Sequence, residues 1–381
     1  MCKRIFANQT STIGDVPFYK IGTFGKEADA YISSKLYVEY RNKYSFPQKG
    51  DILISAAGTL GRTVVYDGEK AYFQDSNIVW LDINKTRLCN EYLNQYYKVI
   101  KWASSEGSTI ARLYNGIIYA TYISLPPLPE QQRIAEALSD VDGMISSLEK
   151  LVAKYKSIKT ACLQQMFPQN GETVPRMRLP GFTGAWEQRK YGEVVETRRG
   201  LTYKPSDICD SGIRVLRSSN IDEDTFVLKA DDVFVKKDAV NIDYSKENDI
   251  LITSANGSTR LVGKHAIISS ISGNPAVHGG FMLLGTTKEP YFINASMGSS
   301  WYRRFIELYV AGGNGAIGNL NKNDLDNQVI LIPSEPEQRA IGAFFKQLDH
   351  LITLHQRKLE KIQKIKQGMM QQLLTGKIRL K

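Results

Sequence analysis

The sequence predicts an α+β protein in which two mixed α/β domains are separated by two long antiparallel coiled-coil helices, arranged as an internal pseudo-twofold repeat. The stretch PEQQRIAEALSDVDGMI at residues 129–145 returns 207 residues later as PEQRAIGAFFKQLDHLI at residues 336–352. After each opening, apolar residues recur at alternating steps of four and three, which is the seam pattern of a coiled coil. Short apolar runs separated by loops of small residues precede each opening, which is typical of β-strands.

The bulk composition limits the class of protein. A chain of 381 residues is too long for one ordinary domain. Its net charge of +10 favours a polyanionic partner, although nucleic acid, an acidic protein and a membrane surface all fit that charge. The sequence contains no long apolar run and no signal peptide, so we expect a cytoplasmic protein that neither spans nor binds a membrane. Its four cysteines are far apart and predict neither a disulfide framework nor a zinc site.

The first mixed domain is predicted at residues 1–128. VPFYKIGTF at residues 16–24 supplies one strand. GDILISAAGTLGRTVVYDG at residues 50–68 reads as a strand, a loop of small residues ending in Arg62, and a second strand. YISLPPLP at residues 122–129 is predicted to be the strand that leads into the first long helix.

The first long helix is predicted at residues 129–168. Proline at its start and Glu130 in its first turn suit a helix N-terminus, where negative charge is favoured. A linker rich in proline and glycine follows at residues 169–184. The predicted seam residues of this helix are Ile134, Leu138, Val141, Ile145, Leu148, Val152 and Tyr155.

The second half repeats this plan, with a mixed domain at residues 185–335, a helix at 336–376 and a basic tail at 377–381. NDILITSANGSTRLVGKHA at residues 248–266 matches the strand–loop–strand of the first domain. IRVLRSSNI (213–221) and VILIPSEP (329–336) match the two other strands. Because the chain must return across a domain, we expect the two helices to pack antiparallel. The second seam is predicted to contain Ile341, Phe345, Leu348, Ile352, Leu359 and Ile362.

Two positions of the seam are polar. Lys159 and Lys366 occupy the same place in the two copies, each beside an isoleucine. His355 stands where the first helix has Leu148, and we expect it to be a partly exposed coiled-coil residue rather than a ligand.

Taken together, these stretches resemble the specificity (S) subunits of type I restriction–modification systems, the HsdS family. The resemblance rests on the PEQ openings, on MRLPGFTGAWEQRKYGEV at residues 177–194, on the two DILI runs with their loops, and on QQLLTGKIRL at residues 371–380. It covers essentially the whole chain, and the order and duplication of these motifs make it specific. The resemblance implies two target-recognition domains, each reading one half of a bipartite DNA sequence, with the helices fixing the gap between the halves.

The resemblance also implies partners and cofactors. The expected partners are double-stranded DNA, two modification subunits that bind S-adenosylmethionine and methylate adenine, and restriction subunits that use ATP and Mg. The chain itself is expected to bind no cofactor or metal and to catalyse nothing. We expect the apolar seam and the Pro/Glu/Gln helix starts to be docking surfaces for the methyltransferase subunits.

The sequence departs from the family pattern at its N-terminus. The lead-in RLPGFTGAWEQRKYGEVVETRRGLTYKP at residues 178–205 introduces the second domain, but no counterpart introduces the first. The resemblance therefore implies that the first recognition domain is less stable, or that its register on DNA is altered.

Residues that contact DNA are expected on loops, because Arg and Lys pair with guanine, Asn and Gln pair with adenine, and phosphate contacts supply affinity. Small residues in SAAGTLGR and SANGSTR would let backbone amides approach a phosphate, but an ordinary turn with a solvated arginine is an equal alternative. The glycine-rich stretch at 312–325 is more typical of a turn than of a nucleotide loop. The candidates are Asn8, Gln9, Lys20, Thr59, Arg62 and Arg112 in the first domain, and Arg198, Arg199, Tyr203, Lys204, Arg217, Ser218, Asn220, Asn256, Ser258, Arg260 and Lys264 in the second.

Other classes of protein fit less well. An enzyme acting on DNA by itself would need a methyltransferase motif, a GxxxxGK[ST] loop or clustered carboxylates. The acidic stretch DGEK at residues 67–70 instead reads as a hairpin turn between two strands. A coiled-coil scaffold that does not bind DNA, or a partial or silent specificity subunit, are the remaining alternatives.

Overall fold

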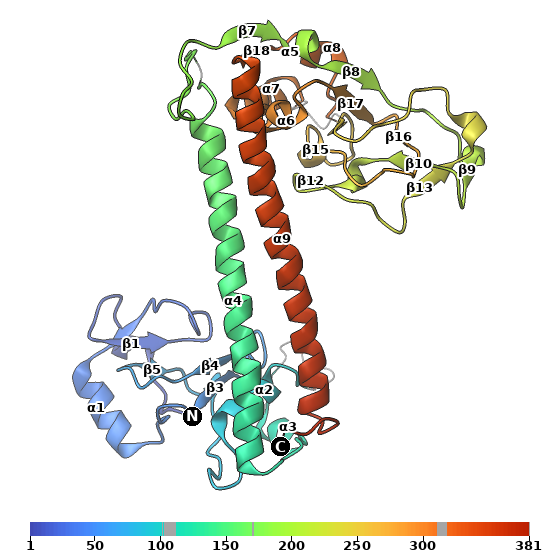
Figure 1. Ribbon diagram of the computed structural model, residues 1–381. Helices are drawn as coiled ribbons and strands as arrows, with labels where there is room; N and C mark the ends of the chain where they lie inside the picture. The colour runs from blue at the N-terminus through green and yellow to red at the C-terminus, as the bar shows by residue number, and fades with distance from the viewer. Residues whose placement is uncertain (101, 103–111, 170, 311–317, 381) are drawn as a thin grey trace. The chain divides into compact units, whose positions relative to one another are not determined.

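The chain forms two compact units, each of which combines small β-sheets with helices, so the mixed class predicted from the sequence is confirmed (Figure 1). The first unit comprises residues 1–149 and 357–381, and the second comprises residues 150–356. The long helices α4 (Leu128–Gln165) and α9 (Glu335–Leu373) each contribute to both units. The computed structural model describes residues 1–100, 102, 112–169, 171–310 and 318–380.

The first unit has two three-stranded sheets. In one, β1 lies between β2 and β5, and in the other β3 lies between β4 and β6. The apolar run of β3 is buried on both faces, as a central strand requires. Helix α1 begins after Ser33, whose hydroxyl accepts a hydrogen bond from the backbone N–H of Leu36. The elements are β1 (Val16–Tyr19), β2 (Tyr31–Ile32), α1 (Ser34–Lys43), β3 (Ile52–Ser55), β4 (Thr63–Val65), β5 (Tyr72–Phe73), β6 (Ile78–Val79), α2 (Asn90–Tyr97) and α3 (Asn115–Tyr119).

The second unit extends the same plan. Strand β10 lies between β16 and β13, with β9 at the edge, and β14 lies between β15 and β17, with β8 beyond β17. Strand β18 pairs with β7, and β11 pairs with β12. The strands are β7 (Glu187–Lys190), β8 (Glu196–Arg199), β9 (Ile208–Cys209), β10 (Ile213–Leu216), β11 (Ile221–Asp222), β12 (Thr225–Phe226), β13 (Val233–Val235), β14 (Ile250–Thr253), β15 (His265–Ile267), β16 (Ala276–His278), β17 (Met282–Thr286) and β18 (Val329–Ile332). The short helices are α5 (Tyr191–Val194), α6 (Pro290–Met297), α7 (Ser300–Tyr309) and α8 (Lys322–Asp326).

The two units share their strand pairing. Strand β1 pairs in parallel with β5, as β10 does with β16. Strands β3 and β14 each pair antiparallel with a neighbour on either side. The strand–loop–strand repeat predicted from the two DILI runs therefore forms the centre of one sheet in each unit.

Two local predictions are wrong. Residues 122–125 form no strand, whereas their counterpart β18 does, because β18 has β7 as its pairing partner. Residues 67–70 do not form a hairpin turn, because they connect β4 and β5, which belong to different sheets.

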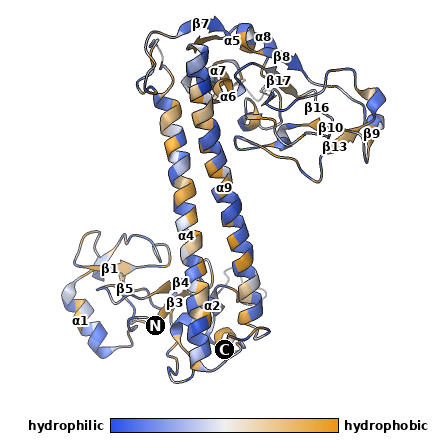
Figure 2. Ribbon diagram, in the orientation of Figure 1, coloured by the Kyte–Doolittle hydropathy of each residue, from blue (hydrophilic) through white to orange (hydrophobic). Residues whose placement is uncertain are grey.

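The long helices pack antiparallel within each unit. In the first unit, Ile134 and Leu138 near the start of α4 lie in one buried cluster with Met370 and Leu373 near the end of α9. In the second unit, Cys162 near the end of α4 shares a core with Ile341 and Phe345 near the start of α9. Hydrophobic and hydrophilic bands alternate along both helices, as a two-helix seam requires (Figure 2). Of the predicted seam residues, Ile134, Leu138, Leu148, Val152, Ile341, Phe345, Leu348 and Ile352 are buried, and Val141, Ile145, Tyr155, Leu359 and Ile362 are half-buried.

Three of the polar side chains at the helix starts, which were expected to dock partner subunits, are buried within the chain, whereas Pro129 and Pro336 are exposed. Glu130, Gln131 and Glu337 are almost inaccessible to solvent. The Gln131 side chain donates a hydrogen bond to the Pro126 carbonyl (2.7 Å), and Gln338 makes the equivalent bond to Pro333 (2.8 Å). These side chains bind the chain's own backbone, so their polar groups are already hydrogen-bonded within the chain.

Each unit has an ion pair that joins α4 to α9 at the same position of the repeat. In the second unit, Lys159 of α4 pairs with Asp349 of α9 at 2.8 Å. In the first unit, Lys366 of α9 pairs with Asp142 of α4 at 2.5 Å. The lysines and the aspartates occupy matching positions of the two copies, so each polar seam position is neutralised by the opposite helix. His355 is half-buried and stacks on Tyr155, with the ring centroids 5.6 Å apart.

Candidate nucleic-acid interface

In the second unit, four loops that follow strand ends meet at one place. These are residues 200–203 after β8, 217–220 after β10, 254–258 after β14 and 279–281 between β16 and β17. Backbone hydrogen bonds join them. Leu201 N–H donates to the His278 carbonyl (2.8 Å), Gly279 N–H donates to the Leu216 carbonyl (2.8 Å), and Ser254 N–H donates to the Phe281 carbonyl (2.9 Å). We call these four segments the loop cluster of the second unit.

The loop cluster depends on glycine where its backbones touch. A Cβ added to Gly200 would lie 2.0 Å from the carbonyl oxygen of Gly279, which is far inside van der Waals contact. Position 200 therefore admits only glycine, and the close approach holds the loop after β8 against the loop before β17.

The loop cluster contains several of the predicted DNA-contacting residues. The Asn256 amide donates a hydrogen bond to the Ser218 hydroxyl at 2.9 Å, so residues from two loops lie side by side. Arg217 is half-buried next to them. Ser258 is exposed and Tyr203 is half-buried. This part of the unit presents amide, hydroxyl and guanidinium groups together, which is the chemistry that reads base edges and phosphates.

Other predicted residues lie outside the cluster or face inward. Arg198 of β8 pairs with the buried Asp249 at 3.4 Å and supports the sheet. Arg199 and Lys204 are exposed on either side of the loop after β8. Arg260 is exposed and Lys264 is half-buried in the segment that precedes β15.

The prediction that Asn220 contacts DNA is wrong. Its side chain is fully buried, and its amide donates to the Asp232 carboxylate (2.8 Å) and to the Val227 carbonyl (3.0 Å). Its side-chain oxygen accepts from the backbone N–H of Arg217 (2.8 Å). Asn220 therefore shapes the loop that presents Arg217 and Ser218, and has no surface left for a ligand.

The first unit repeats part of this arrangement with different side chains. Ala56 N–H donates to the Asn77 carbonyl (2.8 Å), as Ser254 does to Phe281. The Arg112 guanidinium donates to the Asn77 side-chain oxygen at 2.8 Å. Arg62 is turned inward, because it donates to the Ile21 carbonyl (2.9 Å) and lies over the ring of Phe24.

The remaining candidates of the first unit are dispersed. Thr59 is exposed in the loop after β3, and Lys20 pairs with Asp29 at 2.8 Å. Asn8 and Gln9 belong to the short 3-10 helix Ala7–Gln9. In the second unit, residues 312–317 of the glycine-rich stretch lie outside the described residues.

Sequence reasoning missed one residue of the cluster, Phe281. Its ring is 74% exposed, although it follows two glycines between two apolar strands. An aromatic residue at a strand start is usually counted as core, and only the Gly-Gly pair before it signals a turn that points it outward.

Beneath the cluster, His278 of β16 is buried and its Nε2 lies 3.3 Å from the Arg198 carbonyl. Burial lowers the pKa of His278 to about 4, so the ring is neutral at physiological pH.

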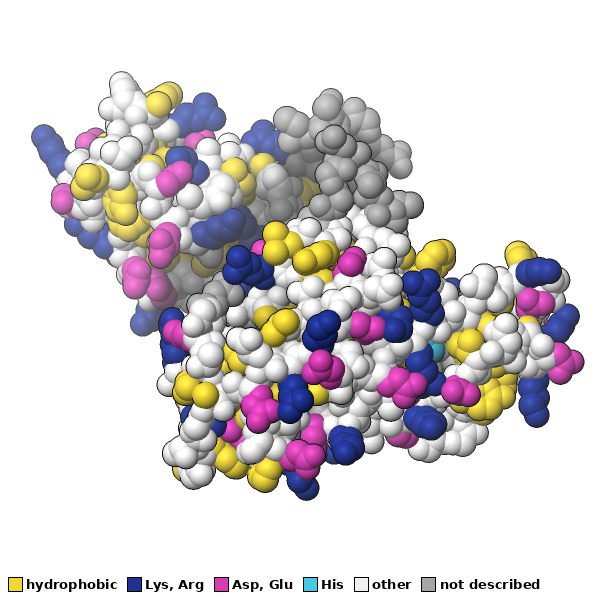
Figure 3. Space-filling model, turned by 90° about the horizontal axis from the view of Figure 1, so that it is seen from above, with side chains coloured by type: hydrophobic (Ala, Val, Ile, Leu, Met, Phe, Trp, Pro, Cys, Tyr) yellow, Lys and Arg dark blue, Asp and Glu magenta, His cyan; other side chains and the backbone are white. Residues whose placement is uncertain are grey.

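The surface charge is mixed. On the face seen in Figure 3, Lys and Arg side chains are interspersed with Asp and Glu side chains, so the net charge of +10 is not gathered into one positive patch there. Within the described ranges, no group of three or more His, Cys, Asp or Glu residues could hold a metal ion. Nor does any described helix combine the length and apolar character needed to span a membrane.

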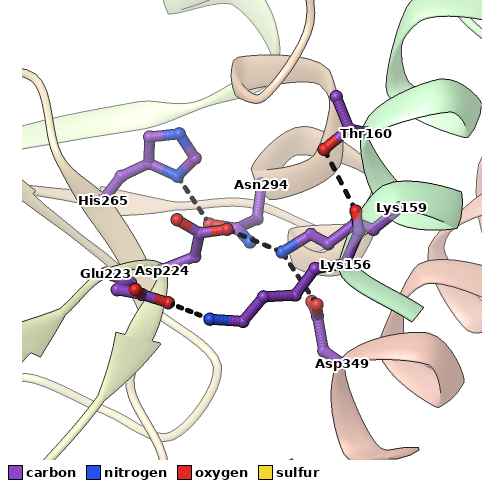
Figure 4. Close-up of polar contacts among 8 residues, drawn as sticks. All are labelled: Lys156, Lys159, Thr160, Glu223, Asp224, His265, Asn294 and Asp349. Atoms are coloured by element: carbon purple, nitrogen blue, oxygen red, sulfur yellow. Dashed lines mark hydrogen bonds and ion pairs between the residues drawn. The ribbon is translucent and has the colours of Figure 1, made fainter. Parts of the chain in front are cut away.

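A polar junction ties the loop cluster to the helices of the second unit (Figure 4). Lys159 of α4 lies between Asp349 of α9 and Asp224, which is in the turn between β11 and β12, at 2.8 Å from each carboxylate. Strand β11 directly follows the loop that holds Arg217 and Ser218. Burial opposes the charge on Lys159, but the carboxylates of Asp349 and Asp224 raise its pKa above the ordinary value. The junction therefore fixes the position of that loop relative to α4 and α9 within this unit.

We expect Lys159→Met to weaken this junction by about 1 to 2 kcal/mol, because it leaves two carboxylates facing each other without their shared cation. The side chain of Lys159 is only 14% exposed, so water cannot replace the lost contacts fully. Hydrogen exchange of peptides covering β11, β12 and the first half of α9 measures the loss. Lys156→Met is the matched control: Lys156 pairs with Glu223 at the surface, and its loss should change stability by less than about 0.5 kcal/mol. Equal effects of the two substitutions would contradict the assigned role.

Several known proteins similar to this chain are described as type I specificity subunits. The family model for the type I restriction modification DNA specificity domain matches residues 1–159 and 184–364. A putative type I restriction enzyme specificity subunit of Haemophilus influenzae is 58% identical over 148 residues, which are 39% of this chain and 38% of that protein. A type I restriction enzyme specificity subunit of Methanocaldococcus jannaschii is 25% identical over 369 residues, 92% of this chain and 84% of that protein. The crystal structure of a type I restriction–modification S subunit from M. genitalium has the same fold, with a TM-score of 0.62 and 14% identity over 98% of this chain and 92% of that one.

Proposed function

Because the chain belongs to the family of type I restriction–modification DNA specificity domains, we propose that it is the DNA-specificity subunit of such a system, with each of its two units reading one half of a bipartite target. The observation that carries this proposal is the strand pairing that the two units share. The loops at the strand ends present different side chains, with an Asn77–Arg112 pair in the first unit and an Asn256–Ser218 pair in the second. A shared scaffold with different polar groups is what reading two different base sequences requires.

In this proposal the helix pair determines the gap between the half-sites. A cross-helix ion pair in each unit, together with the buried seam residues, holds α4 and α9 side by side there, which supports a spacer role for the helix pair. The gap itself is left unread.

The chain works by binding rather than by catalysis. Double-stranded DNA and two modification subunits are its proposed partners, together with restriction subunits. S-adenosylmethionine belongs to the modification subunits, and ATP with Mg belongs to the restriction subunits. We propose that two modification subunits dock on α4 and α9 near Ile158 and Ile365, which occupy matching repeat positions and are both exposed.

The experiment that tests the proposal is a methylome. The chain is expressed with its modification subunit in a host that lacks adenine methylation, and N6-methyladenine is mapped by single-molecule sequencing. We expect a split motif with two defined halves and a fixed gap. Binding of that motif by the assembled complex should weaken steeply as salt increases, because phosphate contacts release counterions. A complex that assembles but methylates no motif would contradict the proposal and favour a scaffold or a silent subunit.

A further inference from the structure

Phe281 is an unusual side chain for the surface of this unit. With 74% of its surface exposed, it is the most exposed large apolar residue among those described in residues 150–356. A phenyl ring gains free energy by leaving water, so a fold that only required packing would bury it. The ring is therefore available for an apolar contact outside the unit, and burying it there would be favourable.

The backbone holds the ring in place. The Phe281 carbonyl accepts hydrogen bonds from both Ser254 N–H (2.9 Å) and Ala255 N–H (3.1 Å). Met282 N–H closes a turn onto the Gly279 carbonyl (2.8 Å), and Gly279 N–H donates to Leu216 (2.8 Å). Phe281 thus projects from a turn that is fixed to two neighbouring strands, so presenting its ring costs little additional ordering on binding.

Polar side chains lie on the segments to which the turn of Phe281 is bonded. The turn of Phe281 is bonded to the segment that continues into Asn256, and Gly279 is bonded to the strand that continues into Arg217 and Ser218. An apolar group among donors and acceptors has one matching feature in the major groove, the C5-methyl group of thymine. We propose that Phe281 is a specificity-determining residue that reads a thymine in the half-site of the second unit through that methyl group. This inference rests on the proposed function.

The first unit provides an internal comparison. Its equivalent of Phe281 is Asn77, whose carbonyl receives the Ala56 N–H just as the Phe281 carbonyl receives Ser254 N–H. There the side chain is an amide whose oxygen is bonded to Arg112, so the position offers polar groups and no apolar surface. Dependence on a thymine methyl at this scaffold position is therefore specific to the second half-site.

The test uses the full chain assembled with its modification subunits, on a duplex that contains the motif found in the methylome. Each thymine of the motif is replaced in turn by uracil, which deletes only the methyl group, and the Kd is measured by fluorescence anisotropy at fixed salt. In the second half-site, one replacement should weaken binding about tenfold, the value expected for one methyl group in an apolar contact. With Phe281→Ala, the same replacement should have less than about a twofold effect, because the contact is already lost.

Two control variants complete the design. Phe281→Leu keeps an apolar side chain and should retain part of the response to uracil. Tyr244→Ala removes a partly exposed aromatic side chain that lies near the start of β16, where Ser245 N–H bonds to Ala276, at the opposite end of that strand from Phe281. It should leave the uracil response unchanged, and unchanged thermal unfolding of the Phe281 variants shows that the unit remains folded.

The outcomes separate the two proposals. If the complex methylates no motif, the proposed function fails, and the present inference fails with it. If a motif is found but no uracil replacement in the second half-site depends on Phe281, only this inference is overturned. Equal weakening of all sequences by Phe281→Ala also overturns it, because a ring inserted between base pairs or seated on a protein partner would act in that way.

Discussion

Replacing Arg178 by alanine is expected to lower the free energy of unfolding of the second unit by about 3 kcal/mol, because it leaves a buried carboxylate without its cation. The guanidinium of Arg178 donates two hydrogen bonds to Glu337 at the start of α9, at 2.7 and 2.6 Å. It also donates to the Gly184 carbonyl at 2.6 Å. Glu337 is 1% exposed, so water does not reach it in the intact unit.

Hydrogen exchange measures this loss within the intact chain. Peptides covering β7, β18 and the start of α9 should exchange about 100-fold faster in Arg178→Ala, which is the rate factor that corresponds to about 3 kcal/mol. Adding Glu337→Gln removes the unpaired charge and should restore part of the protection. Unchanged exchange in the single variant would show that the pair does not stabilise the unit.

The first unit contains the matched control. Arg379 clasps Glu130 at the start of α4 with the same two-bond geometry, at 2.7 and 2.6 Å. The side chain of Arg379 is 55% exposed, however, so its removal opens Glu130 to water. Arg379→Ala should therefore destabilise its own unit less than Arg178→Ala destabilises the second one.

Lowering the pH from 6.5 to 4 is expected to destabilise the second unit by about 3 kcal/mol through His278 alone. Burial lowers the pKa of His278 to about 4 in the folded unit, whereas the unfolded chain has the ordinary value of about 6.5. Between these values the unfolded chain binds a proton that the folded unit does not. The contribution of the neutral His278 ring to the stability of the unit is therefore fully present above pH 6.5 and is lost as the pH falls toward 4. Burial also lowers the pKa of His265, which adds a loss of the same sign.

Urea unfolding of the wild type and of His278→Gln at pH 7 and pH 4.5 tests this dependence. Glutamine removes the titrating group and places an amide N–H near the position of Nε2, which lies 3.3 Å from the Arg198 carbonyl, so the variant should lose less stability on acidification than the wild type. All four histidines of the chain lie in the second unit, so the first unit reports on carboxylates alone. Equal losses in the variant and the wild type would show that another group is responsible.

The long helices were predictable because helical periodicity is local. The repeated openings and the apolar steps define α4 and α9 to within a few residues, with α4 at Leu128–Gln165 where the sequence predicts 129–168. The central strands β3 and β14 were predictable for the same reason, because each is one continuous apolar run.

The burial of polar side chains was not predictable, because it depends on partners far away in the chain. Glu130 and Glu337 resemble ordinary exposed first-turn carboxylates until the clasping arginines are placed, and Arg379 lies 249 residues from Glu130. From the sequence, Asn220 has the amide side chain of a residue that contacts bases, but in the folded unit this amide is hydrogen-bonded to Asp232. Phe281 shows the opposite error, since an aromatic residue beside an apolar strand is exposed by a turn.

The reciprocal ion pairs also constrain how such a chain can be inherited. Each pair takes its lysine from one copy of the repeat and its aspartate from the other, Lys159 with Asp349 and Lys366 with Asp142. A recombination that exchanges only the residues before α4, or only those between α4 and α9, leaves both pairs intact. A recombination that replaces only α4 or only α9 with the helix of a divergent related gene can break both ion pairs at once. An exchanged segment between α4 and α9 must, however, keep the acidic group of Asp224 and the guanidinium of Arg178, because these two side chains bind Lys159 of α4 and Glu337 of α9.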